Sequence, residues 1–379
     1  MRKLFSIVFS VALLLIVSGP GAWAQKGKVY DLGTYPGGTW AEAGGINDFG
    51  VLVAQGDTAD GDSHLFRIGL FGSQAGQWFD LGALGSNLGW FTWPQTADTG
   101  SVAGYAATSG GYVHAFVTTG KSERIDLGTL ADIGYDSYDY SAADAVNKAG
   151  SLIAGSSWSV TSGGQFPVVW TPTSGWNAHG QTITWKIHKL DTRGFPHGFA
   201  MGVNDFGQIS GAAFDDEGIY IALVWNPIPG GKGWETVQLP GSSEFPDVAI
   251  AGGINEKGET VGDVLTPDWV HGYSALWQPA DPLRRTYKLT LLPNPWGLPQ
   301  GDTAEGINDA GDIVGASWDA DYNFVAVRWT TKDPTFVAPL GFPGDWSLAY
   351  QVNELGIATG TYGGGTCANE CVAAVQFSH

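Results

Sequence analysis

Residues 304–318 read AEGINDAGDIVGASW, and near-copies of this stretch recur along the rest of the chain. The copies share an Asn-x-x-Gly core and follow one another at intervals of about 51 residues, a spacing typical of propellers and solenoids. The anchoring residues are Asn47, Asn147, Asn204, Asn255, Asn308 and Asn353, and a weaker copy has Asp98 where the others have asparagine. The fold is therefore expected to be built from repeats.

Each copy predicts a β-hairpin. A short Ala-x-x-(Ile/Val) segment, as at 251–254, precedes the Asn-x-x-Gly core, and a second apolar strand follows it. Asn at the first position and Gly at the fourth favour a type I turn in which the Asn side chain caps the turn and Gly adopts a positive φ. The second strand is expected to end at a small residue, namely Gly104, Gly211, Gly262, Gly315 or Gly360, with Ala54 and Ala154 in the equivalent places.

Two further strands complete each repeat. The third is apolar and often ends in an aromatic residue, such as Trp170, Trp225, Trp277 or Trp329, and the fourth resembles the FDLGALG of residues 79–85. Four short strands predict one antiparallel sheet per repeat, and several such sheets bury their faces by stacking around an axis. The sequence therefore predicts an all-β fold, a seven-bladed β-propeller of four-stranded antiparallel blades.

The two ends of the repeat region are complementary. Residues 28–38, KVYDLGTYPGG, form a fourth-strand element without the preceding three strands, and residues 373–377, AAVQF, form a third strand with no fourth strand after it. We expect the N-terminal strand to pair into the last blade and close the ring, which removes sheet edges that would otherwise pair with other chains. A β-solenoid is the structural alternative.

The first residues have the features of an export signal. Arg2 and Lys3 precede an apolar run over 4–17, and Ala22-Trp23-Ala24 has the small-x-small form of a signal peptidase site. We predict a signal peptide at 1–24, leaving 25–379 as a single propeller domain of seven repeats in the extracellular space or periplasm without a membrane anchor. An uncleaved anchor is the alternative.

Charge and cysteine content narrow the classes of partner. The chain has 18 basic and 37 acidic residues, which argues against nucleic acid and anionic membranes as partners. The two cysteines, Cys367 and Cys371, predict one local disulfide in an exported protein, with a redox-active pair as the alternative. We expect the closed ring to be a monomer.

The linked motifs Asp-Leu-Gly-Thr-Leu, Ala-x-x-Ile-Asn-x-x-Gly-x-Ile-Val-Gly and His-Ala-Phe resemble the HAF-repeat family of bacterial extracellular repeat proteins. The tripeptide is His114-Ala115-Phe116, and His64 and His271 begin relaxed versions. The resemblance covers essentially the whole region 25–379 and implies a secreted propeller-like protein, but it supplies no catalytic residue set. Most third strands lack the histidine, so we interpret these histidines as strand-start residues.

The irregular loops opposite the Asn-x-x-Gly turns are the predicted binding surface, because variable loops on a repeat scaffold often carry function. Their aromatic rings and neighbouring acids suit a glycan or an extracellular protein as ligand. The alternative is that these rings wedge between blades. The predicted ligand-binding residues are Trp40, Trp90, Trp93, Tyr135, Tyr138, Tyr140, Trp296 and Trp346.

Acidic residues in the loops raise two further hypotheses. A pair of carboxylates at the mouth of the channel would suit a glycoside-acting hydrolase or lyase, and the candidates are Asp136, Asp139, Glu244, Asp247, Asp302 and Asp345. Asp57, Asp60 and Asp62 crowd hard oxygen ligands into one loop and are the candidate Ca²⁺ ligands, with a plain acidic turn as the alternative. The sequence contains no recognised catalytic motif, so no catalytic residue is assigned and a non-catalytic binding or scaffold module is the expected function.

Overall fold

The computed structural model describes residues 27–83, 94–118, 124–130, 140–159, 163–173, 184–231, 233–242, 248–266, 272–298 and 301–377. The regular structure in these residues consists entirely of β-strands. The strands are β1 (Lys28–Gly33), β2 (Ala41–Ile46), β3 (Val51–Asp57), β4 (Ser63–Gly69), β5 (Trp78–Ala83), β6 (Gln95–Thr96), β7 (Val102–Ala107), β8 (Val113–Thr118), β9 (Arg124–Asp126), β10 (Ser141–Val146), β11 (Ile153–Ser159), β12 (Gly164–Pro172), β13 (Trp185–Lys189), β14 (His197–Val203), β15 (Ile209–Phe214), β16 (Tyr220–Pro227), β17 (Trp234–Gln238), β18 (Ala249–Ile254), β19 (Thr260–Leu265), β20 (Gly272–Pro279), β21 (Tyr287–Leu291), β22 (Asp302–Ile307), β23 (Asp312–Trp318), β24 (Phe324–Thr330), β25 (Val337–Pro339), β26 (Trp346–Val352), β27 (Ile357–Gly364) and β28 (Cys367–Gln376).

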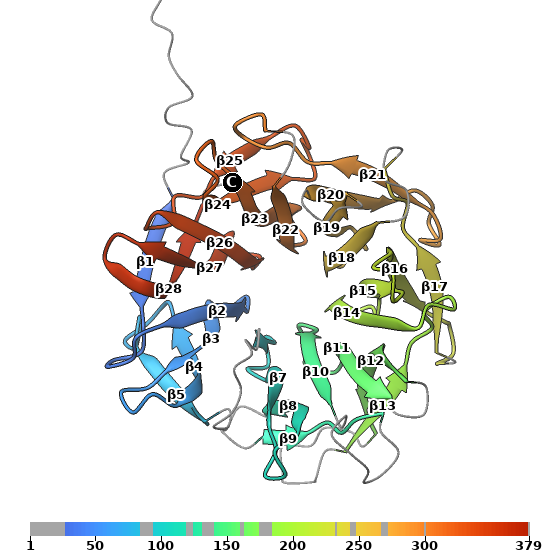
Figure 1. Ribbon diagram of the computed structural model, residues 1–379, viewed down its shortest axis with the longest axis horizontal. Coiled ribbons are helices and arrows are strands. Elements are labelled where there is room, and N and C mark those ends of the chain that lie inside the picture. The colour runs from blue at the N-terminus through green and yellow to red at the C-terminus, as the bar shows by residue number, and fades with distance from the viewer. Residues whose placement is uncertain are drawn as a thin grey trace, which may run out of the picture.

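Within the described residues these strands form seven four-stranded antiparallel sheets, arranged as blades around a central axis (Figure 1). Six blades use four consecutive strands each, from β2–β5 to β22–β25. The first strand of a blade lies nearest the axis and later strands lie progressively outward (Figure 1). The predicted seven-bladed β-propeller is confirmed.

The last blade combines the two ends of the chain. Its strand order is β1-β28-β27-β26, and β1 pairs antiparallel with β28, with Lys28 opposite Gln376 and Tyr30 opposite Ala374. Figure 1 shows the blue N-terminal strand beside the red C-terminal strands. The predicted closure of the ring is therefore confirmed, and β28 does not present a free edge.

The core lies between neighbouring blades. Trp225 at the end of β16 is fully buried and packs with Val169 and Leu190 of the preceding blade. Its indole Nε1 donates a hydrogen bond of 2.8 Å to the Asp191 backbone oxygen, so the one polar atom of the ring is satisfied. Trp277 and Trp329 repeat this arrangement, with donor bonds of 2.8 Å to the backbone oxygens of Pro240 and Pro293.

Two predicted alignments are wrong by one residue. In the second blade Ala97 occupies the position of the turn asparagine, because the Gly100 backbone N donates to the Ala97 oxygen, and Asp98 therefore holds the next position. In the third blade the turn has an extra residue, and Gly155, rather than Ala154, lies opposite Ala143. In the third blade Ala154 and Gly155 are both small, so the pattern of residue sizes gives no signal for the shift, and in the second blade the acid Asp98 resembles a substituted asparagine.

The disulfide between Cys367 and Cys371 is confirmed, with the two Cα atoms 6.0 Å apart within the last blade. No helix in the described residues is long and apolar enough to cross a membrane. The predicted signal peptide, residues 1–24, lies outside the described residues.

Candidate functional site

The Asn-x-x-Gly turns join neighbouring blades as well as closing hairpins. Asn308 Oδ1 accepts the Asp312 backbone N at 2.8 Å, and Gly311 adopts a φ of 89°, as the predicted turn requires. Asn308 Nδ2 also donates to the backbone oxygen of Asn353 in the next blade, at 2.9 Å. Asn353 Nδ2 continues the ring to the Asn47 oxygen of the first blade, at 2.9 Å. Five of the six repeated asparagines cap their own turn and tie it to the next one, whereas Asn147 Nδ2 donates to Ser151 Oγ of its own turn.

The seven residues that follow the first turn position, one from each blade, form a ring of charged side chains around one end of the axis. In six blades this residue is an acid, and in the third blade it is Lys148. Most of the acids accept a backbone N–H from the preceding blade, as Glu354 does from Asp309 at 2.9 Å and Asp48 does from Glu354 at 2.9 Å. The acids are Asp48, Asp98, Asp205, Glu256, Asp309 and Glu354.

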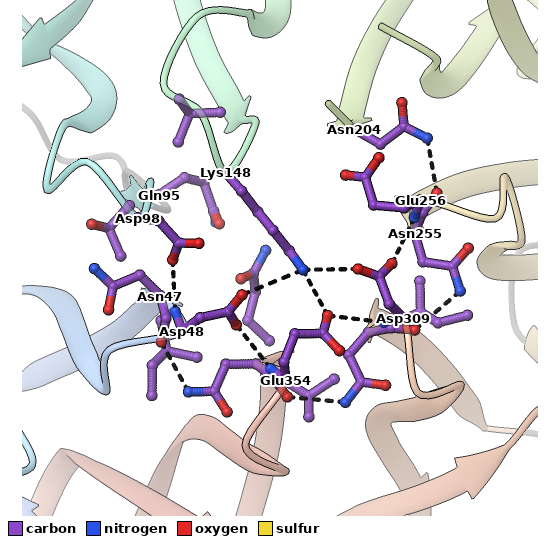
Figure 2. A pocket seen from close by; sticks show the side chains of 18 of the residues that line it. Asn47, Asp48, Gln95, Asp98, Lys148, Asn204, Asn255, Glu256, Asp309 and Glu354 are labelled. Carbon is purple, nitrogen blue, oxygen red and sulfur yellow. Dashed lines mark hydrogen bonds and ion pairs between the residues drawn. The ribbon is translucent and has the colours of Figure 1, made fainter. Parts of the chain in front are cut away.

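Lys148 spans this ring. Figure 2 shows its side chain reaching across to the opposite blades, where Nζ lies 2.7 Å from Glu354, 2.9 Å from Asp309 and 3.4 Å from Asp48. These carboxylates raise the pKa of Lys148 against the opposing effect of burial. One cation thus partly compensates six acids, and it also blocks the middle of the ring.

The channel behind this ring contains the main cavity. A small cavity of about 90 Å³ lies within the ring, and a larger one of about 550 Å³ is lined by the innermost strands. The two adjoin each other, since both are lined by Gln95, Val146, Val203, Ile254, Ile307 and Gln351. The volume of the larger cavity is sufficient for a small organic ligand.

Side chains from several blades bring aromatic rings and carboxyl groups together in this cavity. The rings include Tyr105, Tyr140, Phe199 and Tyr350, and the central cavity has no lysine, arginine or histidine among its described lining residues. Glu42 lies beside the cavity in β2, where Glu42 Oε1 accepts the Tyr350 hydroxyl at 3.0 Å and Glu42 Oε2 accepts Gln55 Nε2 at 3.1 Å. Neutral donors therefore hold the Glu42 carboxylate.

Asp263 and Glu305 share one hydroxyl group. Thr303 Oγ1 lies 3.0 Å from Asp263 Oδ2 and 2.7 Å from Glu305 Oε1. A hydroxyl has one proton to donate, so two ionised carboxylates cannot both be satisfied by it. Burial raises the pKa of both groups, and the Glu305 charge raises that of Asp263 further. Asp263 Oδ1 also accepts the Ala304 backbone N at 3.1 Å, whereas burial favours the protonated form of each carboxyl group.

Asp144 is the fourth carboxyl group of this region. It projects from β10 at the third residue before the turn asparagine, and no described residue forms a hydrogen bond with its carboxyl group. Burial raises its pKa to about 7. Its charge acts on Tyr105 and Tyr140, and it contributes to raising the pKa of Tyr140 to about 12 after burial itself. A carboxyl group without a partner thus lies near two phenol rings.

The predicted aromatic binding surface is only partly brought together. Tyr140 lines the central cavity, whereas Trp40, Trp296 and Trp346 do not. Trp296 packs against the apolar cluster around Trp329, which matches the alternative that these rings wedge between blades. The remaining predicted aromatic residues, Trp90, Trp93, Tyr135 and Tyr138, lie outside the described residues.

The acidic loop residues occupy separate places. Asp302 is buried and accepts Asn294 Nδ2 at 2.8 Å, and Asp345 is exposed in another loop. Asp136, Asp139, Glu244 and Asp247 lie outside the described residues. The carboxyl groups that do meet, Asp263 and Glu305, come from inner strands and were not predicted.

In the candidate calcium loop, Asp57 caps the preceding loop. Its Oδ1 accepts the backbone N of Thr39 at 2.6 Å and of Trp40 at 2.9 Å, and these bonds outweigh burial and lower its pKa. Asp60 and Asp62 are exposed. Among the described residues no three His, Cys, Asp or Glu side chains are grouped as a metal site. Calcium binding by this loop remains a prediction.

The histidine of the tripeptide motif has a partner within its own blade. His114 Nδ1 lies 2.8 Å from Asp126 Oδ2, and His64 Nδ1 lies 2.8 Å from Asp80 Oδ2. Each aspartate is the acid of a neighbouring Asp-Leu-Gly segment, so the two motifs are linked by cross-strand contact. This supports a structural role for His64 and His114. His271 lies outside the described residues.

The cavity was not predicted from the sequence, although its lining includes the two middle residues of the Ala-x-x-(Ile/Val) segments. The first of these positions faces the cavity, and it is glycine in two blades but Asp144, Glu305 and Tyr350 in three others. A charged or large residue at a position that is elsewhere glycine is the signal that points to the channel.

No family profile matches the chain, and no curated protein matches it. Solved structures with a similar fold include a Trypanosoma rangeli sialidase, which is 11% identical with a TM-score of 0.44 over 92% of this chain and 58% of that chain. A lectin from Aleuria aurantia is 13% identical with a TM-score of 0.34 over 83% and 99%, and TolB from Acinetobacter baumannii is 10% identical with a TM-score of 0.42 over 86% and 79%. The chain spans little more than half of the sialidase chain. These similarities concern the fold alone.

Proposed function

We propose that the protein is an exported binding module that takes a glycan into its central cavity. The observation that carries the proposal is the cavity of about 550 Å³ in which Tyr105, Tyr140, Phe199 and Tyr350 meet carboxyl groups. Aromatic faces stack on the apolar patches of sugar rings, and carboxyl groups accept hydrogen bonds from hydroxyls. The other ligand class compatible with this chemistry is an extracellular protein that presents apolar patches and hydrogen-bond donors to the cavity.

Export is part of the proposal. The disulfide is typical of oxidising compartments, and the N-terminal residues have the pattern of a cleaved signal. We also propose that the chain is related to the HAF-repeat proteins, on the basis of its linked Asp-Leu-Gly and His-Ala-Phe motifs. Direct measurement of secretion and of the mature N-terminus tests this part.

A second candidate function is glycoside hydrolysis or elimination. Asp263 and Glu305 are bridged by Thr303, and burial raises the pKa of both, which favours an arrangement of one acid next to one carboxylate. Glycosidases use such a pair, with the acid protonating the leaving oxygen. This places the candidate catalysts inside the channel instead of in the outer loops.

The test is a glycan array followed by pull-down with residues 25–379, with product analysis of every bound sugar. Phe199→Ala removes a ring from the cavity, and the matched control Phe206→Ala removes an exposed ring outside it. Binding that falls at least tenfold in Phe199→Ala alone supports the cavity. Binding that is lost instead in Trp346→Ala would move the site to the outer loops.

Product analysis separates the two candidate functions. Intact sugars support a binding module. Cleavage that disappears in Glu305→Gln but persists in the exposed control Glu217→Gln would support the hydrolase or lyase.

A further inference from the structure

The charge of the cavity lining indicates which kind of glycan would bind there. Asp144, Asp263 and Glu305 line the cavity and Glu42 adjoins it, and its described lining residues include no basic side chain. Tyrosines complete the set of titratable side chains, which is Glu42, Tyr105, Tyr140, Asp144, Asp263, Glu305 and Tyr350. Every ionisation in this set adds negative charge.

Lys148 of the adjoining ring does not line the cavity. Lys148 lies in the ring at the end of the channel, where Asp48, Asp309 and Glu354 already engage it. Within that ring Glu256 Oε2 is buried without a hydrogen-bond partner among the described residues. The ring therefore adds to the negative field of the channel, which low-dielectric walls focus along the axis.

Among the carboxyl groups of the cavity, Asp144 has the most to gain from a hydrogen-bond donor on a ligand. Glu42 already has Tyr350 and Gln55 as donors, and Asp263 and Glu305 share the Thr303 hydroxyl. The Asp144 carboxyl group has no such donor from the described residues. It acts electrostatically on Tyr105 and Tyr140, so aromatic rings accompany it.

We infer that the ligand of the central cavity carries a positive charge, and that Asp144 with Tyr105 and Tyr140 receives an ammonium group of an amino sugar. This inference rests on the proposed glycan-binding function of the same cavity. An ammonium group both donates hydrogen bonds to a carboxylate and is attracted to aromatic faces. A neutral sugar leaves the carboxylate charge uncompensated, and an anionic sugar is repelled by it.

The experiment compares probes of equal length and different charge. Glucosamine hexamer, N-acetylglucosamine hexamer and galacturonate hexamer are titrated against residues 25–379 by calorimetry at pH 7, near the pKa of Asp144, so that a share of the protein carries the carboxylate while a share of the amines is still protonated. Spermidine is titrated as a cation without a sugar ring. We expect the glucosamine hexamer to bind at least tenfold more tightly than its acetylated counterpart and the galacturonate hexamer to show no binding.

Variants assign the effect to one carboxyl group. Asp144→Asn keeps the shape of the side chain and should remove at least tenfold of the affinity for the glucosamine hexamer, whereas the exposed control Asp321→Asn should not change it. Thermal melting of both variants shows that they are folded. Glu305→Gln serves as a second variant of the cavity if Asp144→Asn does not fold.

The outcomes separate the inference from the function on which it rests. Equal or tighter binding of the acetylated hexamer overturns the charged ligand and leaves the glycan site in place. If only spermidine binds, the preference for a cation is supported and the proposed glycan-binding function is overturned. Failure of every probe, or an unchanged affinity in Asp144→Asn, overturns the assignment of Asp144.

Discussion

The burial of Asp144 lowers the stability of the folded protein when its carboxyl group is ionised. Its pKa is about 7 in the folded chain, against 3.8 for an unperturbed aspartate, because burial disfavours the carboxylate. The raised pKa means that the folded state binds a proton between these values and the unfolded state does not. The resulting stabilisation is present at low pH and is lost as the pH rises through 7.

Replacing Asp144 with Asn should therefore stabilise the protein at high pH. The shift of about three pKa units corresponds to about 4 kcal/mol, and solvent access to the half-buried group reduces this to roughly half. We expect the free energy of unfolding of Asp144→Asn to exceed that of the parent at pH 8 and to match it at pH 4. Urea unfolding at both values measures the difference, with Asp321→Asn as control. An equal gain at both pH values would contradict the proposed cause.

At the scale of the hairpin, Asn308 makes both a turn cap and a bond to the next blade. Asn308→Ala should lower the free energy of unfolding by about 2 kcal/mol, because it removes three buried hydrogen bonds. The exposed Asn323→Ala is the matched control. Identical melting curves for the two variants would show that the asparagine ring adds nothing to stability.

The hairpins also show which features of this protein can be predicted from its sequence. The hairpins were predictable because a turn depends on local chemistry, and Asn308 and Gly311 supply it within four residues. The cavity was not, because the meeting of Asp263 with Glu305 depends on the packing of two blades about the axis. The shift from Asp98 to Ala97 was missed for a related reason: an acid resembles a substituted asparagine until the backbone hydrogen bonds are known.

At the scale of the whole molecule, Lys148 connects the third blade to the sixth, seventh and first. Lys148→Met would leave Asp48, Asp309 and Glu354 without their cation, and partly exposed groups of this kind should cost roughly 1–2 kcal/mol at pH 7. Lys257→Met on the turn of the fifth blade is the control, because Lys257 is exposed and forms no ion pair in the described part of the chain. Equal melting of the two variants at pH 7 would contradict a role for Lys148 in holding the ring.

The N-terminal strand β1 contributes to stability by completing the last blade. β1 covers the edge of β28, so a chain that begins at residue 34 would expose a row of unpaired backbone groups. We expect this chain to melt at a lower temperature than one that begins at Gly27 and to form dimers or larger species through the exposed edge. Light scattering across a concentration series measures the association, and melting measures the stability. A truncated chain that stayed monomeric and equally stable would show that β1 is not needed for the last blade. The propeller would then be held closed by the packing of β26, β27 and β28 against β2 of the first blade.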